Sequence, residues 1–359
     1  MFKDRTFIIA EAGVNHNGDL RQALELVRVA AASGADAVKF QSFKADRLST
    51  AAAKKAAYQE AALGAAQSQH EMLRALELDE IAQLAIVGEC RKQSIIFMST
   101  PFDEASADFL VNQAEMDIVK IGSGDLTNAP LLLHIARLGK KIILSTGMAS
   151  VQEITEALSV LMFGFNEPNR RPELGDIKAI EQIGKFSSLS QQVSLLHCTT
   201  EYPAPMDELN LRAIPTMREK FGLSVGYSDH SAGITIPPAA VALGASIVEK
   251  HFTIDRTQQG PDHRASLEPL ELAAMVRAIR DVERALGSGN KLPTESESKN
   301  REIARRSIVA AKKIAKGEEF SESNLTTKRP GTGLRPIELW NLIGRKSSRS
   351  YDADEAIEL

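Results

Sequence analysis

Two histidines, His230 and His251, follow short apolar runs of the sequence in the same way. The runs are Leu223–Tyr227 and Ser246–Val248. Between them lies an apolar stretch of helical length, Ile236–Gly244, which opens with two prolines of the kind that a first helical turn tolerates. This pattern predicts a strand, a crossover helix and a second strand. Parallel strands joined in this way end at the same edge of a sheet, so both imidazoles are expected to lie together there.

Two neighbouring imidazoles can bind a metal ion, whereas a single histidine at a strand end more often makes a local hydrogen bond. Asp229, Glu249 and Asp262 lie near the histidines and carry further carboxylate oxygens. Zinc sites usually have three or more protein ligands, so two histidines with positions left for water and substrate favour Mn or Mg. The residues by themselves leave metal binding and local hydrogen bonding both open.

Two lysines, Lys39 and Lys120, each fall inside an apolar segment, where a lysine is seldom buried without an anionic partner. Ser123 stands between two glycines just after Lys120, and Ser145 begins a Ser-Thr-Gly turn. Ammonium groups, hydroxyl donors and accessible backbone N–H groups together predict a cradle for a small ligand with phosphate and carboxylate groups. A Schiff-base lysine is the competing chemistry, and the residues do not exclude it.

Glu11 ends another apolar run and is the leading candidate for a general acid or base. We expect it at a strand end opposite the strands that carry the two histidines. The alternative, that Glu11 only forms an ion pair with one of the lysines, is equally compatible with the residues.

Eight apolar segments that alternate with helical patterns predict the strands that must position these side chains. They are Phe7–Ala10, Ala37–Phe40, Ile95–Met98, Ile118–Ile121, Lys141–Leu144, Val193–Leu196 and the two runs before the histidines. Eight strand–helix repeats in about 280 residues are typical of a TIM, or (β/α)8, barrel. In that fold the active site lies at the carboxyl ends of the strands, so the polar residues there, including Gln41, Thr100, His197 and Ser228, are expected to line one mouth.

The predicted barrel occupies residues 1–286, and two insertions interrupt its repeat. Ser49–Glu77 is longer than the usual loop after a strand and is expected on the active-site side as a lid. Phe163–Lys185 is polar and contains proline, and we expect it to be a surface excursion.

A polar linker, residues 287–300, is predicted to follow the barrel. Residues 301–359 contain short β-type runs and are predicted to form a small β-rich domain, which is too small to be more than marginally stable unless it docks onto a larger surface. Arg329, in a loop of this domain, would offer a guanidinium group to that surface.

Composition restricts the classes of function. The 359 residues include 43 Lys and Arg and 47 Asp and Glu, a formal net charge of −4, so no basic field predicts binding to nucleic acid or to an acidic membrane. The two cysteines, Cys90 and Cys198, are far apart, which indicates a reducing compartment. Because no segment reads as a secretory signal or a membrane span, we expect a cytoplasmic protein.

A series of segments spans nearly the whole chain in a fixed order: IIAEAGVNHNGD, AVKFQSFKAD, STPFD, KIGSGD, ILSTGM, LLHCTTEYPAP, GYSDHSAG, IVEKHFT, GPDHRASLEP and TTKRPGTG. With them the chain resembles the sialic acid (nonulosonic acid) synthase family. The resemblance implies a TIM barrel followed by an SAF, or antifreeze-like, domain. It also implies an enzyme that condenses phosphoenolpyruvate with an N-acetylated mannosamine-type sugar and water and releases phosphate.

Within that family the segments are most similar to N,N'-diacetyllegionaminate synthases, which use 2,4-diacetamido-2,4,6-trideoxymannose. N-acetylneuraminate synthases, which use N-acetylmannosamine, are the alternative. Thr200 stands where some neuraminate-making members have asparagine, so that contact is not carried over.

The resemblance also implies roles for single residues. His230 and His251 correspond to the ligands of a Mn or Mg ion, and Glu11 corresponds to the catalytic glutamate. The residues implied to contact phosphoenolpyruvate are Lys39, Thr100, Lys120, Ser123, Ser145 and Ser228, and those implied to contact the sugar are Gln41, Tyr202 and Asp262. Arg329 corresponds to a catalytic arginine that the tail domain of one subunit directs at the sugar's N-acetyl group in its partner, which implies a domain-swapped homodimer.

The implied reaction begins when C3 of phosphoenolpyruvate attacks the sugar aldehyde, which the metal ion polarises. Water then adds at C2, and phosphate leaves with cleavage of its C–O bond. In this chemistry the lysines orient phosphate and carboxylate, which decides against a Schiff base. Two other classes are a non-catalytic saccharide-binding protein built on the tail and a metal hydrolase on the same barrel, which the absence of a His-x-His pair at the first strand disfavours.

Overall fold

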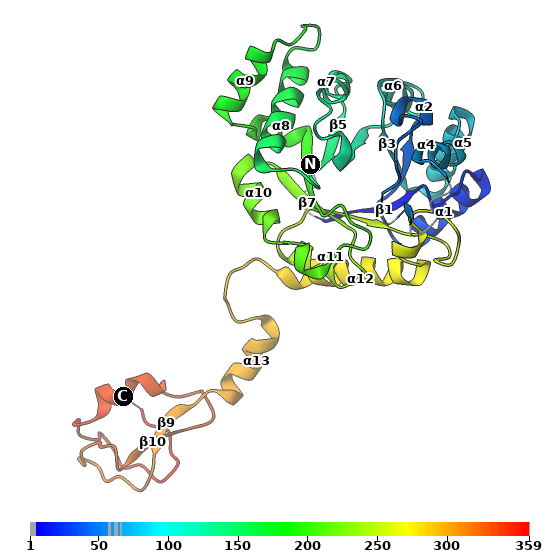
Figure 1. Cartoon of the computed structure of the whole chain (residues 1–359). Helices are drawn as coiled ribbons and strands as arrows, with labels where there is room; N and C mark the ends of the chain where they lie inside the picture. The colour runs from blue at the N-terminus through cyan, green and yellow to red at the C-terminus, as the bar shows by residue number, and fades with distance from the viewer. Residues whose placement is uncertain (1–4, 57–58, 61–63, 65–66, 359) are drawn as a thin grey trace. The chain divides into compact units, whose positions relative to one another are not determined.

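The computed structural model describes residues 5–56, 59–60, 64 and 67–358. The chain divides into two compact units, Met1–Gly287 and Ser288–Leu359. In the first unit parallel strands form a barrel that helices surround (Figure 1). None of the helices in the described ranges is long and apolar enough to cross a membrane.

Eight parallel strands build the barrel. They are β1 (Phe7–Gly13), β2 (Ala37–Ser42), β3 (Ile96–Pro101), β4 (Ile118–Ile121), β5 (Lys141–Ser145), β6 (Val193–Cys198), β7 (Ser224–Asp229) and β8 (Ile247–His251). Their order in the sheet is β3-β2-β1-β8-β7-β6-β5-β4, and β3 and β4 at its two ends are in contact. The predicted (β/α)8 barrel is therefore confirmed.

Most of the strands extend one to three residues further toward their carboxyl ends than the apolar runs predict. β1, for example, continues past Ala10, and Glu11 pairs with Lys39 on one side and with His251 on the other. The polar residues are thus part of the ladders and do not simply follow them. Glu11 lies beside the strand of His251, so the prediction that it lies opposite the histidine strands was wrong.

Helices cover the outside of the barrel. They are α1 (Leu20–Ala32), α2 (Ala45–Leu48), α4 (Gln69–Ala75), α5 (Glu80–Gln93), α6 (Glu104–Asn112), α7 (Ala129–Arg137), α8 (Val151–Asn166), α9 (Leu174–Ile183), α10 (Ala213–Phe221), α11 (Ile236–Ala242) and α12 (Pro269–Leu286). Short polar side chains begin several of them: Asp19, Asp79 and Ser150 each accept a hydrogen bond from a backbone N–H of the first turn.

The two predicted insertions have different outcomes. Phe163–Lys185 lies mostly at the surface, as predicted, and it contains the end of α8 and the helix α9, whose partly buried Ile177 and Ile180 pack on the core. The predicted lid, Ser49–Glu77, includes α4, but residues 57–58, 61–63 and 65–66 lie outside the described residues. Its role as a lid stays a prediction.

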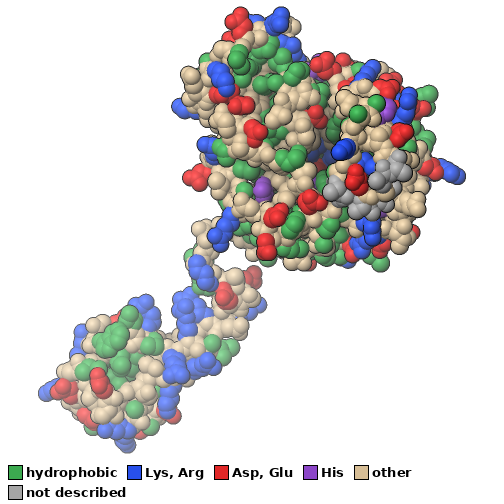
Figure 2. Space-filling view, in the orientation of Figure 1, with side chains coloured by type: hydrophobic (Ala, Val, Ile, Leu, Met, Phe, Trp, Pro, Cys, Tyr) green, Lys and Arg blue, Asp and Glu red, His purple; other side chains and the backbone are tan. Residues whose placement is uncertain are grey.

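The second unit contains α13 (Glu295–Ala304), the antiparallel strands β9 (Ser307–Ala310) and β10 (Leu325–Lys328), and α14 (Leu339–Leu342). The helix α13 occupies part of the segment predicted as a linker. A small apolar core around Ile308, Phe320 and Tyr351 holds this unit together. Four arginines, Arg301, Arg305, Arg306 and Arg335, line a groove of the unit, and Figure 2 shows basic side chains gathered near α13.

Candidate active site

Strand alternation places one polar layer of side chains inside the barrel. The bottom of the interior is apolar, and its members include Ile9, Ala37, Met98, Ile118, Ile143, Leu196 and Ile247. Residues two positions apart on a strand face the same side of the sheet. Two residues further along the strands the interior therefore carries Glu11, Lys39, Thr100, Lys120, Ser145, Cys198 and Glu249, which all line one cavity.

Lys39, on β2, contacts side chains of three other strands within this layer. Its Nζ lies 2.8 Å from Glu11 Oε2 and 3.7 Å from Glu249 Oε2, and it donates a hydrogen bond of 3.1 Å to Thr100 Oγ1. The ammonium group and both carboxylates are almost completely buried. A buried lysine therefore has the anionic partners that its burial requires.

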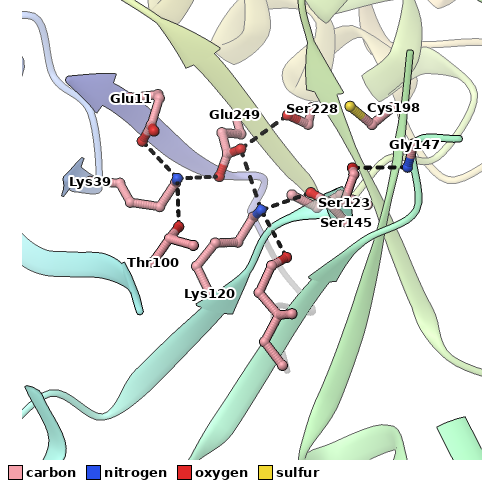
Figure 3. Close-up of polar contacts among 12 residues, drawn as sticks. Glu11, Lys39, Thr100, Lys120, Ser123, Ser145, Gly147, Cys198, Ser228 and Glu249 are labelled. Carbon is pink, nitrogen blue, oxygen red and sulfur yellow. Dashed lines mark hydrogen bonds and ion pairs between the residues drawn. The ribbon is translucent and has the colours of Figure 1, made fainter. Parts of the chain in front are cut away.

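Lys120 makes the second cluster of contacts, across the barrel interior (Figure 3). Its Nζ donates to Ser145 Oγ at 2.7 Å and lies 3.7 Å from Glu249 Oε1. Ser228 Oγ donates to the same Glu249 oxygen at 3.0 Å. Glu249 therefore bridges the two lysines, and the sequence had suggested it only as a possible metal ligand.

Burial opposes ionisation of both carboxylates of the layer, but their pKa values move in opposite directions because the neighbouring lysines act on them unequally. Burial raises the pKa of Glu11 to about 7, although the nearby Lys39 lowers it. Burial also opposes ionisation of Glu249, but Lys120 and Lys39 outweigh it and hold the pKa of Glu249 at about 2. Glu249 is therefore the fixed anion of the layer, and Glu11 can accept or donate a proton near neutral pH.

The same balance acts on the two lysines. Burial lowers the pKa of Lys120, and the attraction of Glu249 does not fully offset this. For Lys39 burial also acts downward, but Glu11 and Glu249 together raise its pKa above the ordinary value.

The backbone at Gly147 closely approaches Ser123, which lines the cavity. Ser123, which begins the short 3-10 helix Ser123–Asp125 after β4, accepts a hydrogen bond of 3.0 Å from Gly147 N through its Oγ. A Cβ at Gly147 would come within 2.2 Å of Thr200 Oγ1 and 2.8 Å of Ser123 Oγ. Only glycine fits this close approach, which keeps the Ser123 hydroxyl at the cavity wall.

The two histidines lie together in the lining of the same cavity, as predicted. Their ring centroids are 5.5 Å apart. His230 Nδ1 donates to the carbonyl oxygen of Thr199 at 2.7 Å, which leaves Nε2 as an acceptor 3.0 Å from the Tyr202 hydroxyl. His251 Nδ1 is buried and has no hydrogen-bond partner among the described residues.

These features fit a metal site. Burial lowers the pKa of His230 to about 4 and that of His251 well below its ordinary value, so both rings are neutral at pH 7, as metal ligands must be. A carbonyl that accepts from the second ring nitrogen of His230 is the usual support of a metal-binding histidine. No group of three or more His, Cys, Asp or Glu in the described part of the chain is arranged to hold an ion, so a metal there would have few protein ligands.

The cavity has a volume of about 170 Å³. It brings together most of the predicted site residues: Glu11, Lys39, Gln41, Thr100, Lys120, Ser123, Ser145, Tyr202, Ser228, His230 and His251. His197 was also expected at the mouth, but it does not line this cavity. Its neighbour Leu196 faces the barrel interior, so the His197 ring points to the other side of the sheet, where Nε2 donates to Leu209 O at 2.7 Å.

Two further predicted residues do not line the cavity. Asp262 is buried beyond the end of β8, where burial raises its pKa to about 6. Arg329 is an exposed residue of the second unit. Gly331 N donates to Glu302 O at 2.6 Å and Ser307 Oγ donates to Pro330 O at 2.7 Å, so the loop after Arg329 is held against its own unit.

Glu249 is the functional candidate that the sequence left without a role in the cradle. The signal that could have found it is the period of two: Ile247, Glu249 and His251 alternate on β8 and face the same side. The apolar run predicts the strand and its polar end, but because this run stops at Val248 it hides the alternation.

Comparison with known proteins agrees with this arrangement. Residues 26–291 match the NeuB family, and residues 305–358 match the SAF domain. An N,N'-diacetyllegionaminic acid synthase of Campylobacter jejuni is 49% identical over 353 residues, which cover 98% of this chain and 99% of the relative. A protein of the same name from Legionella pneumophila is 44% identical over 347 residues, which cover 97% of this chain and 92% of the relative.

A solved structure supports the same family assignment. The N-acetylneuraminic acid synthetase of Leptospira borgpetersenii, in complex with citrate, is 35% identical and superposes with a TM-score of 0.66 over 82% of this chain and 90% of that one. The family resemblance inferred from the sequence segments is therefore confirmed, and the chain belongs to the NeuB family and carries an SAF domain after its barrel.

Proposed function

We propose that this protein is a nonulosonic acid synthase that condenses phosphoenolpyruvate with an N-acetylated mannosamine-type sugar and water and releases phosphate. The observation that carries the proposal is one cavity that two kinds of group line together. Two buried ammonium groups, Lys39 and Lys120, and two neutral imidazoles, His230 and His251, all border it. The ammonium groups suit an anion, and the imidazoles suit a metal ion that activates an aldehyde.

Phosphoenolpyruvate matches the two ammonium groups by its charge. Lys39, Lys120 and the hydroxyl groups of Thr100, Ser123, Ser145 and Ser228 would hold its phosphate and carboxylate groups. A cavity of about 170 Å³ is small, so we place only the three-carbon substrate in its depth and the sugar toward its mouth. In this arrangement Gln41 and Tyr202 contact the sugar at the mouth, and Asp262, which does not line the cavity, contacts the part of the sugar that extends beyond it.

We assign a divalent ion, Mn or Mg, to His230 and His251. When bound, the ion supplies Lewis-acid polarisation of the aldehyde oxygen. Glu11, on the strand next to His251 and with a pKa of about 7, would exchange a proton with the sugar oxygen or the attacking water. Glu249 would keep the two lysines charged and in place while no substrate neutralises them.

For the sugar we propose 2,4-diacetamido-2,4,6-trideoxymannose, which would make the product N,N'-diacetyllegionaminate. Two relatives of that name, each matched over at least 92% of its length, support this choice. The likeness to an N-acetylneuraminic acid synthetase supports N-acetylmannosamine as the second candidate.

The decisive test is phosphate release from phosphoenolpyruvate with each sugar in turn, with and without Mn or Mg. We expect release only when all three components are present, and faster turnover with the diacetamido sugar. Lys120→Met should abolish release, whereas Lys140→Met, which removes a partly exposed lysine paired with Asp117, is the matched control and should not. Phosphate release without any sugar would overturn the assignment as a synthase. A preference for N-acetylmannosamine would overturn only the choice of sugar.

We propose further that Arg329 acts on the sugar of a partner subunit in a domain-swapped homodimer. Two features support this proposal. Hydrogen bonds hold the loop after this exposed arginine against its own unit, and a basic groove lies beside that loop. An inactive Arg329→Ala chain mixed with an inactive Glu11→Ala chain should then recover activity. A confirmed mixed dimer that stays inactive would contradict the swapped arrangement.

A further inference from the structure

A second ion pair, separate from the cavity, lies on the outer side of the same two strands. Lys250 Nζ is 2.7 Å from Asp229 Oδ2, and the two side chains are 1% and 0% exposed. Asp229 and Lys250 are direct partners in the ladder between β7 and β8. Because side chains alternate along a strand, this pair faces away from the interior that holds Ser228 and Glu249.

The pair also binds the backbone around His230. Asp229 Oδ1 accepts a hydrogen bond of 2.9 Å from Ser231 N, and Lys250 Nζ donates to Ser231 O. Residues 229 and 231 are therefore both tied to Lys250, with His230 between them. Lys250 itself immediately precedes His251 in the chain.

Stability does not explain why these positions should be charged. Burying two charges is costly, and apolar residues of similar volume often stabilise a fold equally well or better. What the ionic pair supplies, and an apolar pair cannot, is a set of directed hydrogen bonds that fix His230 relative to the strand of His251. The requirement for two imidazoles at a set separation gives a reason for such a device.

We propose that Asp229 and Lys250 are positioning residues that hold His230 and His251 in register for metal binding. The inference rests on the proposed metal function of the two histidines. Neither residue lines the cavity, so each can act on the site only by positioning residues that do.

The test uses the full-length protein and three variants. Lys250→Met leaves Asp229 buried without its partner, and it should lower both the melting temperature and the affinity for Mn. Asp229→Asn combined with Lys250→Met removes both charges with little change in shape, and it should recover most of the melting temperature. The control, Ser224→Ala with Ser246→Ala, removes a cross-strand contact of 2.5 Å at the other end of the same strand pair.

Mn binding is measured by electron paramagnetic resonance without phosphoenolpyruvate or sugar. We expect the neutral pair to bind Mn at least tenfold more weakly than the parent, as is typical when an outer support of a metal ligand is lost, and the control to bind as the parent does. Full recovery of Mn affinity along with stability in the neutral pair would overturn the proposal, because the role would then be structural only.

A metal-independent measurement separates this proposal from the function on which it rests. Ring signals of the seven histidines are recorded by NMR in the metal-free protein, and those of His230 and His251 are expected to shift or broaden in the neutral pair but not in the control. Unchanged signals would overturn the positioning role. If the His230→Ala and His251→Ala variants bind Mn as tightly as the parent does, the metal assignment is overturned. The NMR result would still decide the positioning role.

Discussion

Asp262 shows at the level of one side chain how burial is balanced against function. Its carboxyl group is almost completely buried, and burial alone raises its pKa from 3.8 to about 6. A buried carboxyl that titrates near neutral pH weakens the fold when it ionises. Such a residue is a candidate for ligand binding, which agrees with the proposed contact to the sugar.

The pH dependence of stability tests this view of Asp262. A raised folded-state pKa means that the protonated carboxyl stabilises the fold below about pH 4, and this contribution is lost as the pH rises through about 6. A pKa that rises from 3.8 to about 6 on folding corresponds to about 3 kcal/mol. Asp262→Asn should therefore match the parent in urea unfolding at pH 4 and exceed its free energy of unfolding by about 3 kcal/mol at pH 7.5. A difference that does not change with pH would contradict the raised pKa.

The two cysteines give a second prediction at this scale. Cys90 and Cys198 are free and buried, and burial raises the pKa of their thiols to about 12 and about 11. At pH 8 about one thiol in a thousand or fewer is then ionised, and only the thiolate reacts. Iodoacetamide should leave the native protein unmodified and alkylate both residues after unfolding in guanidinium chloride, as mass spectrometry would detect. Rapid labelling of the native protein would show an accessible thiolate.

At the level of elements, β7 depends on a glycine one layer below Ser228. A Cβ at Gly226 would come within 2.5 Å of Ile247 O, 2.6 Å of Ile247 Cβ and 2.7 Å of Leu196 Cδ2. No side chain fits there, because β6 and β8 approach β7 closely around this position. The close packing sets where the carboxyl ends of these strands, and so His230 and His251, lie.

We therefore predict that Gly226→Ala lowers the free energy of unfolding by about 1–3 kcal/mol, measured by urea denaturation. Gly175→Ala is the matched control, because a Cβ at this position in α9 meets no atom within 4 Å. Alanine in a helix should raise stability there by up to about 1 kcal/mol. Equal effects of the two substitutions would contradict the packing argument for β7.

At the scale of the whole molecule, the barrel unit contains its own apolar core. Two large clusters fill the space between its strands and helices, and a third fills the bottom of the barrel. The second unit has a much smaller core around Ile308 and Tyr351. The barrel should therefore fold without the tail.

A chain that ends at Gly287 tests this independence. We expect it to melt cooperatively within a few degrees of the barrel transition of the full-length protein, followed by circular dichroism. If Arg329 contributes to catalysis as proposed, the same truncated chain binds Mn normally but turns over the sugar at least a hundredfold more slowly. A truncated chain that fails to fold would show that the barrel depends on its tail.

The sequence by itself determined the features that depend on local periodicity. Eight apolar runs predicted the strands, and the helical spacing between them predicted the barrel. The lysines inside two runs and the histidines after two others predicted side chains that line one cavity. The strands and the barrel could be predicted because strand propensity and the position of a residue on its own strand are local properties. Ordered segments such as IVEKHFT then predicted the family.

The tertiary structure decided which side chains meet. It extended β8 to include Glu249 between the two lysines, placed Glu11 beside His251, turned His197 out of the barrel, and paired Asp229 with Lys250 behind the histidines. Each of these outcomes depends on the exact end of a strand or on its neighbour in the closed sheet. A shift of one residue exchanges the interior face for the outer face, and only the closed barrel defines both.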